Sequence, residues 1–369
     1  MTATQAITRQ ALLDAIAKIP REQVALLPTA LEEAPRLRTA LGSAAPRIFI
    51  KRDDLTGLAF GGNKVRHLEF RLADMKAKGC DALVVTNVAQ SNHARLHTAL
   101  AAKHGLTPYI IKIPSHKDEP INGNLLLDHI MGAQIIEAPD AEPETIARML
   151  DELIARLESE GHTVYNVPND PFSKIAGSCG YLIGAIELLD QLEAVGATVD
   201  HIYLASGTSS AGLALAGKLL GESYRVHPVS VGQSRAEIED YVCTTANDAA
   251  ELLGLDVQLT AADVSVHEEY IGERYGVPTA AGLDALRLLG RSEGLILDPV
   301  YTAKAMSALI DHIWQEQIGA DETVVFVHTG GLPITYAYAP EIMASLRESD
   351  GEGVRFEGSV RELTGDRGA

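Results

Sequence analysis

Lys64 is the residue of this 369-residue chain whose setting best suits chemistry. It follows Gly61, Gly62 and Asn63 and stands where a helical pattern begins. Two glycines allow the backbone to approach a ligand closely, and the positive end of a helix disfavours a charged ammonium group. We predict that Lys64 can act as a nucleophile, although an ordinary solvated lysine beside a turn would give the same motif. A Walker phosphate loop does not fit, because Asn63 precedes the lysine and Val65 replaces the magnesium-binding hydroxyl residue.

Two strand-to-helix turns could bind anions. Residues 90–93, Gln-Ser-Asn-His, follow one predicted strand, and Ser91 would cap the next helix, leaving amides and a hydroxyl that suit an amino-acid carboxylate. Residues 206–212 follow another strand and are small and hydroxylated, which suits a phosphate. The second turn has no lysine, which argues against nucleotide γ-phosphate chemistry. Each turn could also be a plain connection without a ligand.

Three further segments could line the same site. Residues 328–333 place paired glycines after an apolar strand, at the sheet edge where open α/β folds bind small molecules. Residues 270–278 and 298–304 contain Tyr275 and Tyr301, whose phenols could donate protons or could simply pack.

The elements that must position these segments are short apolar strands alternating with helices, which indicates parallel pairing with right-handed crossovers. We predict extended segments at residues 47–54, 82–86, 108–113, 134–136, 163–167, 201–205, 226–231, 295–297 and 324–327. Predicted helices include residues 62–78, 91–104, 124–131 and 142–159. The first 46 residues are interpreted as two helices joined by a loop, residues 168–171 as a hinge, and residues 348–369 as a polar surface extension or tail.

Composition narrows the class of protein. A net charge of −19 argues against nucleic-acid binding, which needs a basic surface. No apolar run approaches the ~20 residues that span a membrane, and the first residues lack the basic start of a secretory signal, so we expect a cytoplasmic protein. The cysteines, Cys80, Cys179 and Cys243, are far apart, which favours reduced thiols. The twelve histidines show no ligand spacing, so we expect no metal site.

The motifs together resemble a known enzyme family. Residues 51–57 and 61–64 resemble the approach to the cofactor lysine in pyridoxal-phosphate enzymes of the tryptophan synthase β-subunit type. Within that superfamily the chain is similar to the 1-aminocyclopropane-1-carboxylate deaminase and D-cysteine desulfhydrase group. Five motifs between Lys51 and Pro333 follow the family order, although Leu96-His97 replaces the usual glutamine-led continuation and Thr86-Asn87 stands where a glycine is more usual.

The resemblance implies an α/β fold of two lobes, each a mostly parallel twisted sheet flanked by helices, with pyridoxal 5'-phosphate between them. It further implies a large cofactor-binding domain of residues 1–65 plus 170–369, a small substrate domain of residues 66–169, and a homodimer. A small amino acid would be the substrate, with no nucleic-acid or membrane partner.

The resemblance also implies roles for individual residues. Lys64 would carry the cofactor and then remove the substrate Cα proton. The cofactor would be bound by Asn92, Thr302 and the phosphate-binding residues Ser206, Gly207, Thr208, Ser209 and Ser210. The substrate would be bound by Ser91, Asn92, His93 and Gly330, while Tyr275 or Tyr301 would assist the leaving group.

Thr302 bears on the reaction, because its position faces the cofactor ring nitrogen in this group. A carboxylate there, as in the cyclopropane deaminases, would make the ring a strong electron sink. A neutral threonine favours α,β-elimination from a D-cysteine-like amino acid, giving a 2-oxo acid and ammonia. The alternatives left open are ring-opening deamination, elimination from cysteate, and a cofactor-binding homologue without activity. The sequence does not separate D from L substrates.

Overall fold

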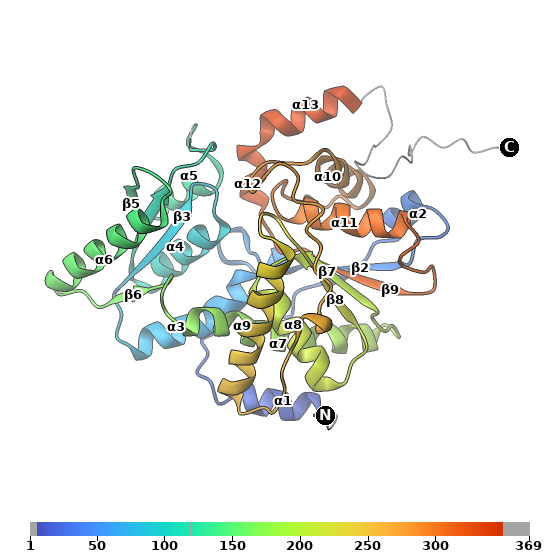
Figure 1. Cartoon of the computed structure of the whole chain (residues 1–369), viewed down its shortest axis with the longest axis horizontal. Helices are drawn as coiled ribbons and strands as arrows, with labels where there is room; N and C mark the ends of the chain where they lie inside the picture. Colours follow the sequence, from blue (N-terminus) through green and yellow to red (C-terminus); the bar gives the residue numbers. More distant parts are fainter. Residues whose placement is uncertain (1–5, 119, 350–369) are drawn as a thin grey trace.

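Two sheets organise the chain (Figure 1). The computed structural model describes residues 6–118 and 120–349. In the larger sheet the strand order is β1-β2-β9-β7-β8, where β1 and β2 pair antiparallel and the other pairs are parallel. Its strands are β1 (Leu31–Glu33), β2 (Arg47–Lys51), β7 (His201–Ala205), β8 (Arg225–Val229) and β9 (Thr323–Val327).

The smaller sheet has the order β5-β4-β3-β6 and is parallel throughout. Its strands are β3 (Ala82–Val88), β4 (Thr107–Ile113), β5 (Gln134–Glu137) and β6 (Val164–Asn166). The helices of the chain are α1 (Arg9–Ile16), α2 (Pro35–Leu41), α3 (Lys64–Ala77), α4 (Asn92–His104), α5 (Gly123–Ile130), α6 (Pro143–Ser159), α7 (Phe172–Ala194), α8 (Thr208–Leu220), α9 (Arg235–Leu253), α10 (Ala280–Glu293), α11 (Thr302–Trp314), α12 (Leu332–Ala337) and α13 (Ala339–Ser349).

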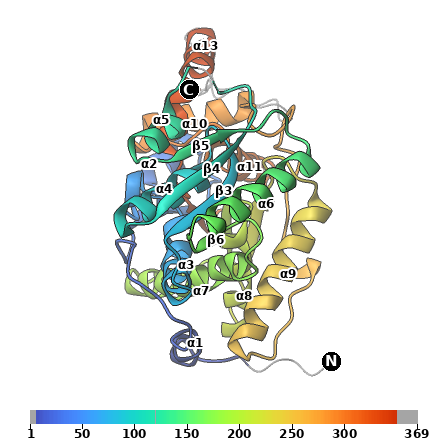
Figure 2. The same ribbon diagram turned by 90° about the vertical axis from the view of Figure 1, so that its left-hand side faces the viewer.

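Each sheet is covered on both faces, as parallel sheets require. In β3, Leu83 and Val85 pack with α3 and α4, while the intervening Val84 packs with α6 on the opposite face. Figure 2 shows these helices beside the smaller sheet. In β2, Ile50 belongs to the core shared with α10 and α11, whereas Phe49 belongs to the core shared with α7 and α8. Successive side chains of a strand point to opposite faces of the sheet, so each sheet contributes to two hydrophobic cores.

Helix α7 is long and apolar enough, by length and composition, to cross a membrane. However, 72% of its most apolar stretch is buried within the fold, and the helix packs mainly against α3, α8 and α9. Its apolar character is therefore explained by a position in the protein core.

The two-lobed α/β prediction is confirmed, with local corrections. The helix predicted at residues 62–78 is α3, and the strand predicted at residues 201–205 is β7. The segment at 47–54 is extended only to Lys51 and continues into a 3₁₀ turn at Asp53–Leu55. The N-terminal prediction missed β1. The strand predicted at residues 295–297 is wrong, because these residues form a loop whose leucines pack into a core without a strand partner. Of the predicted tail, residues 348 and 349 end α13 and the rest lies outside the described residues.

Candidate active site

Four of the segments singled out in the sequence follow the carboxyl ends of parallel strands, whereas residues 270–278 and 298–304 follow irregular segments. The Lys64 segment follows β2, residues 90–93 follow β3, residues 206–212 follow β7, and residues 328–333 follow β9. In open α/β sheets this edge is where ligands bind. The topology therefore brings together motifs that are far apart in sequence.

Lys64 is the first residue of α3, and glycines fix the path of the chain into it. Gly62 has a φ of +130°, and a Cβ atom at Gly330 would lie 2.8 Å from the Gly62 Cα atom. The glycine pair before Lys64 and the glycine pair after β9 therefore pack against each other. Any larger residue at Gly330 would displace the backbone that carries the lysine.

The Lys64 amine is placed to lose its proton. It makes no hydrogen bond or ion pair with any residue that the structure describes, and its side chain is only partly exposed. Burial, helped by the nearby positive charges of Arg95 and Arg71, lowers the pKa of Lys64 to about 8. The start of α3 adds a partial positive charge. A neutral amine is the nucleophilic form that the sequence analysis required.

A buried basic cluster lies beside the lysine. The Arg71 Nη1 atom is 2.8 Å from His97 Nε2 and 3.1 Å from His93 Nε2, and the Arg71 guanidinium donates to the Ser173 carbonyl oxygen. Burial, together with Arg71, holds the pKa values of His67, His93 and His97 well below their usual range, so these imidazoles are neutral. Among the described residues, no carboxylate forms an ion pair with Arg71. The cluster therefore favours a buried anion.

Arg95 is a second buried cation with spare donors. Its Nη2 atom donates to the Gly61 carbonyl oxygen at 2.7 Å, while Nε and Nη1 have no hydrogen-bond partner among the described residues. Burial lowers its pKa to about 10. Leaving buried charged donors unpaired is costly, which is typical of a site that a ligand completes.

The start of α4 presents donors. Ser91 caps the helix by accepting from the Ala94 N–H group at 3.2 Å, and its hydroxyl donates to Asn87 Oδ1 at 2.9 Å. The serine oxygen is thus already engaged, and the backbone amides of the first turn are the groups left for an anion. The side-chain oxygen Oδ1 of Asn92 accepts from Asn124 Nδ2 at 2.9 Å, so the side-chain NH₂ group of Asn92 points away from Asn124.

The turn after β7 forms a hydroxyl-lined cup. Asn63 Nδ2 donates to Ser209 Oγ at 2.8 Å, and His67 lies 3.5 Å from Thr208 Oγ1 and 3.4 Å from Ser209 Oγ. The Ser210 hydroxyl is buried without a partner among the described residues. These groups, with the amides at the start of α8, provide the donors that a phosphate needs.

The first turn of α11 brings Thr302 next to Asp298. The Thr302 hydroxyl donates to Asp298 Oδ2 at 2.8 Å, and Asp298 also accepts from the backbone N–H groups of Val300 and Tyr301. Burial nevertheless raises the pKa of Asp298. A Cβ atom at Gly331 would lie 2.4 Å from Asp298 Oδ2, so a glycine is required there.

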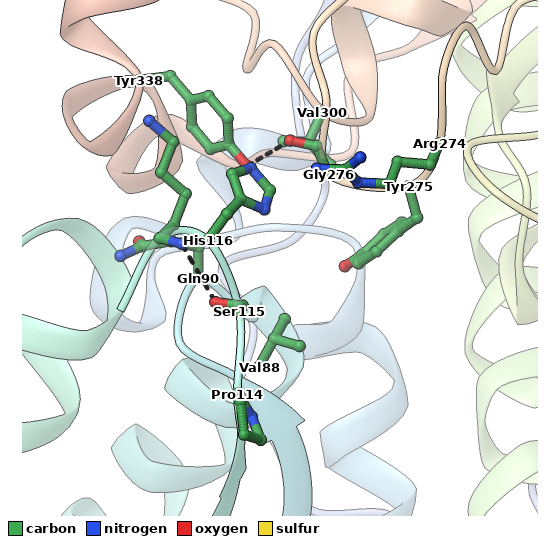
Figure 3. A pocket seen from close by; sticks show the side chains of 11 residues that line it. Val88, Gln90, Pro114, Ser115, His116, Arg274, Tyr275, Gly276, Val300 and Tyr338 are labelled. Atoms are coloured by element: carbon green, nitrogen blue, oxygen red, sulfur yellow. Dashed lines mark hydrogen bonds between the residues drawn. The ribbon is translucent and has the colours of Figure 1, made fainter. Parts of the chain in front are cut away.

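Tyr275 and Tyr301 are brought together, with hydrogen-bonded hydroxyl groups and ring centroids 6.0 Å apart. Burial raises the pKa of both phenols, so they remain protonated. Tyr275 also lines a cavity of about 300 Å³ between the lobes (Figure 3). The cavity is walled by Gln90 and Val88 on one side and by Val300 on the other. Residues of both lobes and one phenol of the pair therefore line the same cavity.

The donor set fits pyridoxal 5'-phosphate. The hydroxyl cup after β7 suits its phosphate, Asn92 suits an acceptor oxygen on its ring, and Lys64 offers an unpaired amine. The unpaired Arg95 donors and the buried cation Arg71 supply the positive charge that its anionic groups require. The fit rests on orphaned polar groups that no described protein residue satisfies.

Sequence reasoning missed Arg71, Arg95 and Asp298. The departure at Leu96-His97 was a signal, because His97 contacts Arg71 directly. Cys179 has no place in the site, since it is buried and burial raises the pKa of its thiol to about 12.

Comparisons with known proteins agree with this geometry. A family model described as pyridoxal-phosphate dependent enzyme matches residues 23–330. The D-cysteine desulfhydrases of Salmonella typhi and Salmonella typhimurium are each 37% identical over 338 residues, covering 89% of this chain and 98% of theirs.

Solved structures show the same fold. A crystal structure of an ACC deaminase homologue has a TM-score of 0.82 and 31% identity, covering 91% of this chain and 99% of its own. Threonine deaminase isoform 2 from Solanum lycopersicum has a TM-score of 0.61 at 16% identity, covering 94% and 91%, which shows the fold alone. The chain belongs to the pyridoxal-phosphate dependent enzyme family, within its tryptophan synthase β-like fold.

Proposed function

We propose that this chain catalyses α,β-elimination from a β-substituted amino acid of the D-cysteine type. With water, D-cysteine would give hydrogen sulfide, ammonia and pyruvate. The observation that carries the proposal is the unpaired Lys64 amine, whose pKa of about 8 makes it available as a base near neutral pH. Similarity to the Salmonella D-cysteine desulfhydrases supports the substrate class.

Each step needs a group that this chain provides. The bound cofactor supplies an electron sink for the negative charge that develops at the substrate Cα atom. Lys64 removes the Cα proton, and the first-turn amides of α4 hold the carboxylate so that this proton faces the amine. The hydrogen-bonded phenols of Tyr275 and Tyr301 remain protonated and donate a proton to the departing thiolate.

Thr302 favours elimination over ring opening. It would lie beside the cofactor ring nitrogen, where it offers a neutral hydroxyl that is already bonded to Asp298. With a hydroxyl instead of a carboxylate facing the ring nitrogen, the ring withdraws electrons less strongly, which suffices when the β-substituent leaves readily. Gly330 would form the pocket wall beside the substrate.

The proposal extends to the assembly and the domain division, for which the family placement is the support. The large cofactor-binding domain comprises residues 1–65 and 170–369, and the small substrate domain comprises residues 66–169. The protein works as a homodimer in the cytoplasm.

The test is a substrate panel with the purified protein and added pyridoxal phosphate. D-cysteine, L-cysteate, D-serine, 3-chloro-D-alanine and 1-aminocyclopropane-1-carboxylate are supplied separately, and pyruvate and 2-oxobutanoate are measured. We expect pyruvate from D-cysteine. 2-Oxobutanoate from the cyclopropane substrate alone would overturn the proposal.

Lys64→Ala is the matched variant, with exposed Lys76→Ala as its control. We expect Lys64→Ala to lose the visible absorbance of the bound cofactor. Its turnover should fall by more than about a hundredfold. Lys76→Ala should behave as wild type. An unchanged spectrum in Lys64→Ala would remove this lysine from the mechanism.

A further inference from the structure

Three histidines converge in the large lobe, away from the residues of the candidate active site. His227 is on β8, His267 is on a segment that bridges to β8 at Val229, and His312 is in the last turn of α11. One ring nitrogen from each histidine lies within 4.8 Å of those of the other two. Because the three residues come from distant parts of the sequence, their spacing could not reveal this arrangement.

We propose that His227, His267 and His312 bind a divalent transition-metal ion of the zinc class. Imidazole nitrogens bind zinc at about 2.0–2.1 Å, which places two ligands of a tetrahedral ion about 3.4 Å apart. His227 Nδ1 and His267 Nε2 are 2.9 Å apart, so a small widening would admit the ion between them. His267 is only half buried, which leaves access for a water molecule as fourth ligand.

The surroundings orient the rings as outer-shell partners orient metal ligands. His227 Nε2 lies 2.9 Å from His201 Nδ1, and His201 Nε2 lies 3.2 Å from a Glu322 carboxylate oxygen. His312 Nδ1 lies 2.7 Å from the Tyr203 hydroxyl, which leaves His312 Nε2 for the ion. For His227 and His312, the nitrogen that would not face the ion already has a partner.

Two further features suit metal binding. The His227 ring is stacked on Tyr203, with centroids 4.2 Å apart and planes 3° from parallel, which fixes its direction. The His267 and His312 ring centroids are 4.5 Å apart, so the third ring lies directly beside the second. A metal-free chain of hydrogen-bonded neutral histidines is the competing explanation.

The ion would tie β8, the segment around His267 and the end of α11 together. Thr302 starts α11 and His312 lies ten residues later, which places the ion about 15 Å along the helix from the candidate active site. We therefore assign it a structural role. The inference does not depend on the proposed elimination reaction.

The test uses the full-length protein without a histidine tag, treated with a chelator and titrated with Co²⁺, whose visible spectrum reports tetrahedral coordination. We expect one Co²⁺ per chain, displaced by Zn²⁺, with a higher melting temperature in the loaded protein. His267→Gln should weaken Co²⁺ binding by roughly tenfold or more, whereas His129→Gln on the exposed face of α5 should not.

His201→Gln provides a second variant that removes no ligand, and it should weaken binding less than His267→Gln does. Circular dichroism spectra and thermal melts of the metal-free variants establish that they fold. Absence of tetrahedral Co²⁺ in the wild type, or equal binding in wild type and folded His267→Gln, would overturn the site in favour of the hydrogen-bonded chain.

Discussion

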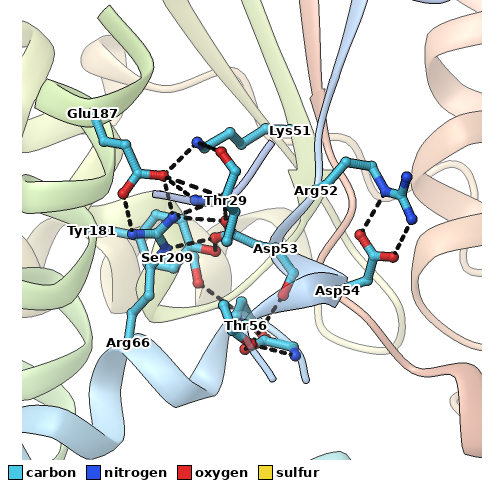
Figure 4. Close-up of polar contacts among 12 residues, drawn as sticks. Thr29, Lys51, Arg52, Asp53, Asp54, Thr56, Arg66, Tyr181, Glu187 and Ser209 are labelled. Atoms are coloured by element: carbon cyan, nitrogen blue, oxygen red, sulfur yellow. Dashed lines mark hydrogen bonds and ion pairs between the residues drawn. The ribbon is translucent and has the colours of Figure 1, made fainter. Parts of the chain in front are cut away.

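Helix α3 carries two buried arginines whose surroundings are opposite. Arg66 makes two hydrogen bonds to the Asp53 carboxylate, at 2.8 and 2.9 Å, and also binds Glu187 (Figure 4). Lys51 binds the same Glu187 at 2.5 Å, so two cations face two carboxylates. Arg71 lies little more than one turn further along the helix. Among the described residues, its hydrogen-bond partners are a backbone carbonyl and neutral imidazoles.

The difference distinguishes buried charges that stabilise the fold from buried charges that are available to bind a ligand. Its carboxylate partners raise the pKa of Arg66 well above its usual value, whereas burial lowers the pKa of Arg71 to about 10. The paired network, joined by a hydrogen bond from Tyr181 to Asp53, anchors α3 to β2 and so holds Lys64 in place. The positive charge of the buried basic cluster around Arg71 is not neutralised by an ion pair among the described residues, so it is available to the cofactor and the substrate.

The largest effect should come from breaking the paired network. Asp53→Asn would leave Arg66 with one carboxylate in place of two, and removing one partner of a buried ion pair costs about 3–5 kcal/mol. Asp54→Asn is the neighbouring control, because its pair with Arg52 is less buried and should contribute at most about 1 kcal/mol. Chemical denaturation of the cofactor-free protein measures both. Equal losses would mean that the network is no more important than a surface pair.

An intermediate effect should come from the buried basic cluster around Arg71, and it should appear in cofactor affinity and not in folding stability. Arg71 is close enough to lower the pKa of both Lys64 and His67, and His67 touches the phosphate cup. Arg71→Met should raise the dissociation constant for pyridoxal phosphate by roughly tenfold, about 1.4 kcal/mol. The unfolding free energy of the cofactor-free protein should change by less than about 1 kcal/mol. The variant loses the hydrogen bonds of Arg71, but it also no longer has the free-energy cost of burying the Arg71 charge, and the two effects oppose each other.

Arg66→Met is the matched control on the same helix. It should strongly destabilise the cofactor-free protein, because Asp53 and Glu187 would be left buried without their main partner. Equilibrium titration with the cofactor, combined with denaturation, separates the two properties. If Arg71→Met were as destabilising as Arg66→Met while binding the cofactor normally, the distinction between the two regions would be wrong.

The same contrast explains what the sequence could predict. Lys64, Ser91 and the turn at residues 206–212 belong to local motifs, and the strand-and-helix alternation predicted the sheet edge at which they meet. Arg71 and Arg95 lie on helix faces that only tertiary packing buries, and a charged residue in a helix is ordinarily solvated. The apolar residues 295–297 failed as a strand because apolar character records burial, whereas a strand also needs a neighbour for its hydrogen bonds.

The smallest effect concerns the pH dependence of stability. The pKa of Lys64 is lowered from 10.5 to about 8 in the folded protein, so the unfolded chain binds more protons between these values. The contribution of Lys64 to the stability of the cofactor-free protein should therefore rise with pH across this window, and its full penalty should be present below about pH 8. Other buried groups titrate in the same window, with lowered pKa values for Lys304, Arg71 and Arg95 and raised pKa values for buried tyrosines. The measured quantity is therefore the difference between wild type and Lys64→Gln.

That difference also tests the link between Arg71 and Lys64. Removing the Arg71 charge in Arg71→Met should raise the pKa of Lys64 towards 10.5 and reduce the pH-dependent gain that the Lys64→Gln comparison isolates. Denaturation of the single and double variants from about pH 8 to 10.5 measures the change. An identical pH-dependent gain in stability with and without Arg71 would mean that burial alone lowers the pKa of Lys64. The buried basic cluster would then bind the ligand without changing the pKa of the amine.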